Sequence, residues 1–216
     1  AYNVAVGANA GLSVTTGTHN TFIGGLAGDA NTTGYYNVAV GTSALSANTT
    51  AISNTAVGKN SLYSNTTGAS NAAVGTYSLD ANTTGADNTA VGYGSLGANT
   101  TAANNTAVGR SALSLNTTGS SNTAVGKDAL KDNTTGADNV AIGELTMENN
   151  TTGVRNTGVG TNALFTGTTG DDNVAIGNAA LYAITTASDN TAVGSDAGKA
   201  LTTGTGNTAL GYSALA

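Results

Sequence analysis

Side chains able to do chemistry are scarce in this chain of 216 residues, which has one His, His19, and no Cys. A single chain therefore offers no His–Cys pair and no multi-His metal site. Carboxylates do occur in pairs, and glycoside hydrolysis needs two of them at a fixed separation. Such pairs are Asp171 with Asp172 and Asp128 with Asp132. No Gly-rich segment has the Lys-Ser/Thr ending of a phosphate-binding loop, so we expect no enzyme, no cofactor and no metal.

The composition excludes further classes of function. Only 8% of the residues are charged and the net charge is −6, whereas binding to nucleic acid needs clustered Lys and Arg to neutralise phosphates. No apolar run is long enough to span a bilayer, so we expect no membrane insertion in this segment. The lack of Cys excludes a disulfide framework. Any functional side chain must therefore be positioned by the backbone fold alone.

An internal repeat dominates the sequence, because every seventeenth residue is Asn, without a slip. The series is Asn3, Asn20, Asn37, Asn54, Asn71, Asn88, Asn105, Asn122, Asn139, Asn156, Asn173, Asn190 and Asn207. With this Asn as position 1, the consensus reads N-[TV]-A-[VI]-G-x-x-[AS]-L-x-x-N-T-T-G-x-x. We predict a single repeat domain over 1–216, with 12 complete repeats in 3–206 and a partial repeat in 207–216.

The repeats also indicate which positions face outward. All 18 charged residues, all eight Tyr and the single His fall at positions 6, 7, 10, 11, 16 or 17. The remaining positions hold Asn, Thr or small and apolar residues in nearly every repeat. We therefore predict that the variable positions form outer columns and that the constant positions form the interior.

The pattern within each repeat favours strands. A repeat of this length is too short for a pair of helices, and Gly and Thr-Thr in each repeat disfavour a helix. The N-T-A-V-G segment places positions 2 and 4 on one face of a strand and positions 3 and 5 on the other. We predict an all-β fold, a parallel β-solenoid in which each repeat is one coil and like residues stack. The predicted structural ladder includes Thr83, Thr84, Asn88, Val91 and Gly92.

Three finer predictions concern the coil. Val or Ile at position 4 and Leu at position 9 are expected to fill the core. The Ala and Gly of positions 3 and 5 have no partner within a thin coil, so we expect chains to associate through this face, with a homotrimer as the leading hypothesis. The Gly of position 15 is expected to have a positive φ, although Ala51, Ala102 and Ala187 replace it.

These residues resemble a known family. The segments NTAVG at Asn54–Gly58, SL at Ser61–Leu62 and NTTG at Asn65–Gly68 resemble the head repeats of trimeric autotransporter adhesins. They are also similar to repeats of bacterial and phage tail fiber domain proteins. The resemblance covers essentially the whole chain, although adhesin head repeats are usually shorter than the repeats found here. It implies a left-handed β-roll, three chains wide, on a cell or virion surface.

The repeated Asn-Thr-Thr segment fits the acceptor pattern for N-glycosylation. It occurs at Asn31, Asn48, Asn65, Asn82, Asn99, Asn116, Asn133 and Asn150. Position 12 is elsewhere occupied by Val14, Gly167, Ile184 and Leu201. Because apolar residues replace this Asn, we favour a packed column over a glycosylated one.

The Thr-Thr pairs of positions 13 and 14 raise ice binding as an alternative, since flat Thr arrays are one use of solenoids. Adjacent residues of a strand point to opposite faces, so only one of the two Thr columns can face outward. Ice binding is therefore the less favoured alternative.

Tyr residues are the candidates for surface recognition. Tyr35 and Tyr36 form the most suggestive exposed pair, and a Tyr ring offers both an apolar face and a hydroxyl group for a sugar or a protein. The candidate residues are Tyr35, Tyr36, Tyr63, Tyr77, Tyr93 and Tyr182. The alternative is that these Tyr are aromatic residues scattered over a polar surface without a role in recognition.

The sequence thus predicts a structural and adhesive fibre segment, a non-enzymatic rod whose variable outer columns carry any recognition. We expect an extracellular, cell-surface or virion location, and a cell-surface or matrix glycan or protein as a possible partner. The alternative is the shaft or receptor-binding segment of a phage tail fibre. Because neither end has a capping sequence, we also expect either a piece of a longer protein or subunits that stack into a filament.

Overall fold

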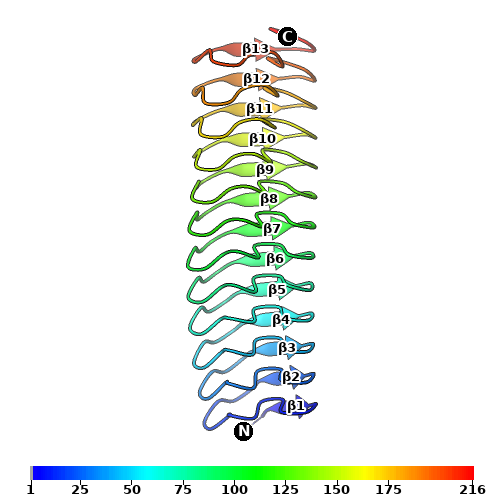
Figure 1. Ribbon diagram of the computed structural model, residues 1–216, viewed down its shortest axis with the longest axis vertical. Coiled ribbons are helices and arrows are strands. Elements are labelled where there is room, and N and C mark those ends of the chain that lie inside the picture. Colours follow the sequence, from blue (N-terminus) through cyan, green and yellow to red (C-terminus); the bar gives the residue numbers. More distant parts are fainter. Residues whose placement is uncertain (1) are drawn as a thin grey trace. The chain divides into compact units, whose positions relative to one another are not determined.

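The computed structural model describes residues 2–216, and their regular secondary structure consists of 13 strands of three residues each (Figure 1). The strands are β1 Val4–Val6, β2 Thr21–Ile23, β3 Val38–Val40, β4 Thr55–Val57, β5 Ala72–Val74, β6 Thr89–Val91, β7 Thr106–Val108, β8 Thr123–Val125, β9 Val140–Ile142, β10 Thr157–Val159, β11 Val174–Ile176, β12 Thr191–Val193 and β13 Thr208–Leu210. The chain divides into two compact units, of which the first ends at Asn105 and the second begins at Thr106.

Each unit is a stack of coils joined by parallel pairing. In the first unit each strand from β1 to β6 pairs with the next, and equivalent residues of neighbouring repeats face each other, as Ala73 faces Ala90. In the second unit the strands from β7 to β13 pair in the same way, as Ala124 faces Ala141. The predicted parallel β-solenoid with one coil for each repeat is confirmed.

Hydrogen bonds between coils extend well beyond the strands. The amide of Leu79 donates to the carbonyl oxygen of Ser95 at 3.0 Å, and that of Thr83 donates to Thr100 at 2.9 Å. Because the corners of each coil are also stacked on the next coil, one inserted residue would break several ladders together. This explains why the repeat keeps a constant length along the whole sequence.

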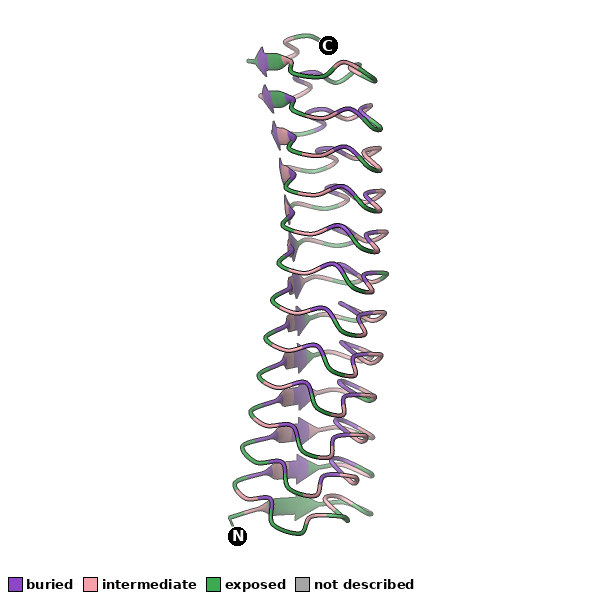
Figure 2. Ribbon diagram, turned by 90° about the vertical axis from the view of Figure 1, so that its left-hand side faces the viewer, coloured by how far each residue is buried: buried purple, intermediate pink, exposed green. Residues whose placement is uncertain are grey.

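The interior is lined by the Ala of position 3 and the Leu of position 9. Ala90 and Leu79 are fully buried, whereas Val74 and Val91 at position 4 are 39% and 37% exposed. Figure 2 shows buried residues, in purple, next to exposed ones, in green, within the coils. The predicted orientation of the strand is therefore wrong, and so is the prediction that the Ala of position 3 faces other chains. The coil is thin, so only a small side chain fits between the strand and the Leu, and the larger Val or Ile points outward.

Glycines at two positions admit the backbone of the next coil. Gly75, at position 5, has a φ of 135°, and a Cβ there would lie 2.5 Å from the carbonyl oxygen of Gly92. Gly85, at position 15, does not have a positive φ, so that prediction is wrong. Its small size matters instead, because a Cβ would overlap the carbonyl oxygen of Ala102.

Three other positions of the coil adopt left-handed backbone without needing Gly. Tyr77 at position 7, Leu79 at position 9 and Asp87 at position 17 have φ values of 58°, 51° and 57°. For an L-residue this conformation costs roughly 1–2 kcal/mol. The hydrogen bonds and burial gained by stacking must offset that cost in every coil, so an isolated coil is not expected to be stable.

Candidate functional site

The Asn of the Asn-Thr-Thr segment belongs to the interior. The Nδ2 group of Asn82 donates to Oδ1 of Asn65 at 2.8 Å and to the carbonyl oxygen of Gly85 at 2.9 Å. The side chains of the eight Asn at this position are buried in the same way. A glycan has no room on such a side chain, so the structure agrees with the packed column and argues against N-glycosylation of the folded chain.

A second Asn ladder follows position 1. Asn88 donates its backbone amide to Oδ1 of Asn71 at 3.0 Å, and its Nδ2 group donates to the carbonyl oxygen of Ala102 at 2.9 Å. In the preceding coil, Asn71 and Asn82 both donate to Gly85, each at 2.9 Å. The two Asn of a coil therefore meet at the carbonyl oxygen of position 15 and close the coil from inside.

The Thr-Thr pair is divided between structure and solvent. The hydroxyl group of Thr83 donates to the carbonyl oxygen of Thr100 at 3.0 Å, whereas Thr84 is exposed. Of the remaining predicted ladder residues, Asn88 is buried, Gly92 is half-buried and Val91 faces outward. The Thr-Thr segment thus gives a single exposed Thr column, as expected from the alternation.

An apolar strip lies on the outward face of the strands of each unit. In the first unit position 4 supplies Val6, Ile23, Val40, Val57, Val74 and Val91, and in the second unit it supplies Val108, Val125, Ile142, Val159, Ile176, Val193 and Leu210. The neighbouring column at position 2 holds Thr, Val or Ala. Neither column contains a charged residue, and we call the two columns the outer strand strip. The orientation of this strip was missed by sequence reasoning.

The candidate Tyr residues do not form one site. Tyr35 and Tyr36 lie edge to face with ring centroids 5.2 Å apart. Tyr36 also contacts His19 at 5.1 Å, and His19 stacks on Tyr2 at 5.0 Å. The prediction of an exposed pair is supported, because Tyr35 and Tyr36 are both exposed. The stack with His19 follows from three aromatic residues at position 17 of successive repeats.

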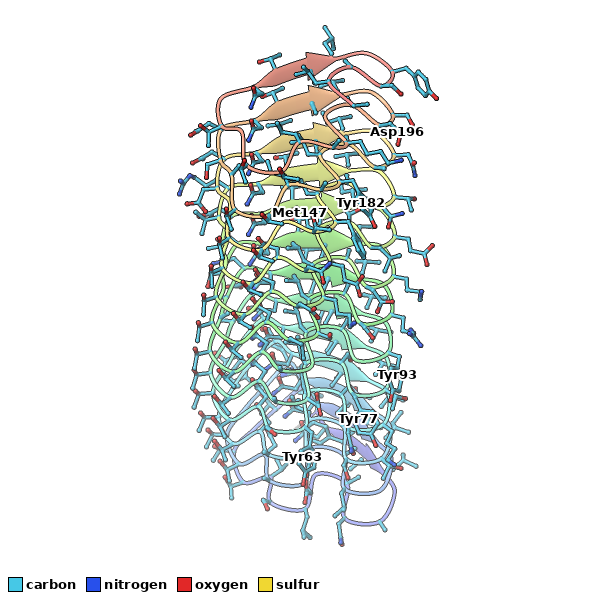
Figure 3. The ribbon with its side chains drawn as sticks, turned by 45° about the horizontal axis from the view of Figure 1, so that its top comes forward. Tyr63, Tyr77, Tyr93, Met147, Tyr182 and Asp196 are labelled. Atoms are coloured by element: carbon cyan, nitrogen blue, oxygen red, sulfur yellow. The ribbon has the colours of Figure 1, made fainter. Side chains whose placement is uncertain are left out.

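The other candidate Tyr residues lie further along the chain (Figure 3). Tyr77 and Tyr93 are edge to face at 6.0 Å, and Nζ of Lys59 lies 5.9 Å from the Tyr77 centroid. Tyr63 is exposed. Tyr182 stacks on Phe165 with centroids 5.3 Å apart. Stacking on Phe165 covers one face of the Tyr182 ring, so that face is not free for a sugar.

Asp172 and Asp128, two of the carboxylates considered for catalysis, lie beside cationic side chains. Arg155 holds Asp172 through two hydrogen bonds of 2.7 Å, and the guanidinium group lowers the pKa of Asp172. The neighbouring Asp171 accepts the backbone amide of Val154 at 2.8 Å. Asp128 lies 3.4 Å from Nζ of Lys127. A catalytic acid needs a raised pKa, whereas the pKa of Asp172 is lowered by its hydrogen bonds to Arg155.

Other kinds of site find little support. Among the described residues, no group of three or more potential ligand side chains is placed to hold a metal ion. None of residues 2–216 belongs to a helix that could cross a bilayer. The exposed surface of the coils includes the outer strand strip and the variable outer columns.

Comparison of the chain with protein-family models, with curated proteins and with solved structures found no match.

Proposed function

We propose that this chain is a structural, non-enzymatic segment of an extracellular fibre, and that copies of it associate through the outer strand strip. The observation that carries the proposal is that the Val, Ile or Leu of position 4 is exposed or half-buried in every described coil. Isolated exposed apolar residues are normal, but continuous apolar strips mark places where proteins meet. The association predicted from the sequence is thereby moved from the Ala of position 3 to the Val of position 4.

A homotrimer is the arrangement we propose. A closed symmetric ring buries the same strip of every copy and leaves none exposed. The columns of charged and aromatic residues stay at the surface of such an assembly. They differ from coil to coil, so they supply the variety that recognition of a cell-surface or matrix glycan or protein requires.

The mass of the chain in solution tests this proposal. Light scattering should give about three times the chain mass of 20.8 kDa. The variant Val74→Lys/Val91→Lys places two charges on the strip and should be monomeric with an unchanged circular dichroism spectrum. The matched control Thr67→Lys/Thr84→Lys carries the same charges on the exposed Thr column and should remain trimeric. A folded wild-type monomer would refute the proposal.

Ice binding is the second candidate, and the strand face now favours it more than the Thr-Thr pair does. Position 2 is Thr in eight of the 13 strands, and these Thr alternate with the Val or Ile of position 4 on one outward face. Such an array is regular along each unit. Measurement of thermal hysteresis decides between the candidates, because a fibre segment should show none.

A further inference from the structure

The hydrogen bonds of the Asn ladder at position 12 run in one direction, and the ladder ends at Asn150. Nδ2 of each Asn donates to Oδ1 of the Asn in the preceding coil, as Asn133 donates to Asn116 at 2.8 Å and Asn150 donates to Asn133 at 2.9 Å. The next residue in the column is Gly167, which has no side chain to donate. Within residues 2–216, Oδ1 of Asn150 receives no hydrogen bond from the protein.

The end of the ladder coincides with a cavity of about 10 Å³ in the second unit. Its lining includes Asn150, Asn156, Gly167, Asn173 and Ile184. The exposed fractions rise at this point, to 3% for Asn150 against 0% for Asn133. A water-sized sphere therefore reaches the side chain of Asn150 but not that of the preceding Asn. Among the described residues, every fully enclosed side-chain N or O atom has a hydrogen-bond partner. Oδ1 of Asn150 differs from these atoms because the cavity makes it accessible to water.

We propose that this cavity is a binding site for a single water molecule that donates a hydrogen bond to Oδ1 of Asn150. A buried carbonyl oxygen without a donor costs about 1–3 kcal/mol, so an occupant that donates is favoured. A cavity needs roughly 10–15 Å³ to hold one water molecule, and the volume of about 10 Å³ found here is at the lower end of that range. The lining also contains the polar residues Asn156, Asn173 and Thr185.

Gly167 is the residue that makes the site. Beyond it the column becomes apolar, with Ile184 buried in the following coil. An Asn at 167 would satisfy Asn150 but would turn its own Oδ1 toward Ile184. A Gly instead leaves space for water at the junction between the polar and apolar parts of the column, so the ladder ends without an unsatisfied group.

Thr166, the residue before Gly167, connects its coil to the next coil through its side chain. The hydroxyl group of Thr166 has one proton to donate, and it lies 2.7 Å from the carbonyl oxygen of Tyr182 and 3.0 Å from that of Ile184. These contacts join the two coils beside Gly167 without using the cavity. A Cβ at Gly167 would lie 3.3 Å from the carbonyl oxygen of Leu164, so a small side chain fits there with slight adjustment.

Nuclear magnetic resonance of the full chain tests the site, with water as the probe. We expect a cross-peak between a long-lived water molecule and the side-chain amide protons of Asn150. The amide protons of Asn133 are the internal control and should show none, because Asn150 already donates to its Oδ1 atom. In Gly167→Asn the new amide group replaces the water molecule, and the Asn150 cross-peak should fall to background.

A control variant and a crystal structure complete the test. The control variant Gly25→Ala, on the surface of the first unit, should leave the cross-peak unchanged, since a Cβ there meets only one atom, at 4.0 Å. If Gly167→Asn does not fold, a crystal structure of the wild-type protein decides the question by its density beside Oδ1 of Asn150. No cross-peak in the wild type, or one that persists in folded Gly167→Asn, would overturn the proposal.

Discussion

The ring of Phe22 occupies the space that Leu fills in other coils, and Gly28 is the residue that leaves this space free. Phe22 is at position 3, where nearly all repeats have Ala, and Gly28 is at position 9, where most have Leu. A Cβ at Gly28 would lie 2.5 Å from Cε1 of Phe22. The two positions therefore share one core volume, and a large residue at one requires a small residue at the other.

Substitutions at Phe22 and Gly28 should compensate each other in a double variant. Phe22→Ala should destabilise the chain by about 3–5 kcal/mol, because it leaves a large cavity in a close-packed interior. Gly28→Leu should also destabilise it, since the new side chain overlaps the ring. The double variant restores the arrangement of the other coils and should recover at least half of the loss. Chemical denaturation measures all four proteins, and simple additivity of the two single losses would contradict the shared volume.

The same pairing shows what the sequence could and could not predict. The unbroken period and the constant Asn predicted the solenoid, because stacked coils need equal lengths. The alternation of positions 2 to 5 could not decide which face is inside, because one face is Ala and Gly and the other is Thr and Val. Only packing against the Leu of position 9 decides this. The signal was present in the exceptions: Phe22 occurs with Gly28, and Gly158 lies beside Thr146 and Met147, whose side chains a Cβ would meet at 2.7 Å and 3.2 Å.

The candidate site was less predictable than the fold. The burial of Asn150 could be inferred from the apolar residues that replace this Asn in other repeats. For the Thr-Thr pair, the alternation predicted that one column is exposed but not that it is the column of Thr84. The outward direction of Val91 could not be inferred, since its side chain is typical of a core. The stacking of Tyr182 on Phe165 was overlooked, although the two lie at position 10 of successive repeats and the period alone would have placed them together.

Substitution of a position 5 Gly should be severe. Gly75→Ala forces a side chain into a left-handed backbone and against the carbonyl oxygen of Gly92, so we expect a loss of about 3 kcal/mol. Gly94→Ser is the matched control at position 7, where a Cβ meets nothing within 4 Å and where other coils carry Ser with a positive φ. Thermal unfolding of both variants checks this, and equal losses would contradict the role of close backbone approach.

The inner Asn column should matter more than the Thr column beside it. Asn82→Ala removes the one donor to Oδ1 of Asn65 among residues 2–216 and leaves a buried acceptor, which costs about 1–3 kcal/mol. Thr84→Ala, two residues later on the surface, should change stability by less than about 0.5 kcal/mol. Denaturant midpoints of the two variants measure the difference. A larger effect at Thr84 would mean that the exposed column, and not the Asn ladder, holds the coils together.

Asp80 should make stability fall as pH rises. Burial raises the pKa of Asp80 above its ordinary value of 3.8. The folded state therefore holds the proton more tightly than the unfolded state, and stability is lost as pH rises through the folded pKa. Asp80→Asn should be more stable than wild type at neutral pH, with the advantage disappearing below pH 3.8. Paired unfolding curves across this range check the sign, and an advantage that persists in acid would contradict it.

The ion pair of Arg155 and Asp172 should have the opposite pH dependence. The hydrogen bonds from Arg155 lower the pKa of Asp172 below 3.8, so the carboxylate stabilises the fold above that pH. This contribution is lost as pH falls through the lowered pKa. Wild type should therefore be more stable than Arg155→Gln at neutral pH and equal to it in strong acid. Added salt should also reduce the difference in stability between wild type and Arg155→Gln at neutral pH, because both side chains are exposed.

Arg110→Gln is the control, since the guanidinium group of Arg110 lies 4.0 Å from Asp128 and should contribute less to stability. If the gap between wild type and Arg155→Gln were the same at every pH, packing of the Arg side chain and not its charge would be the cause.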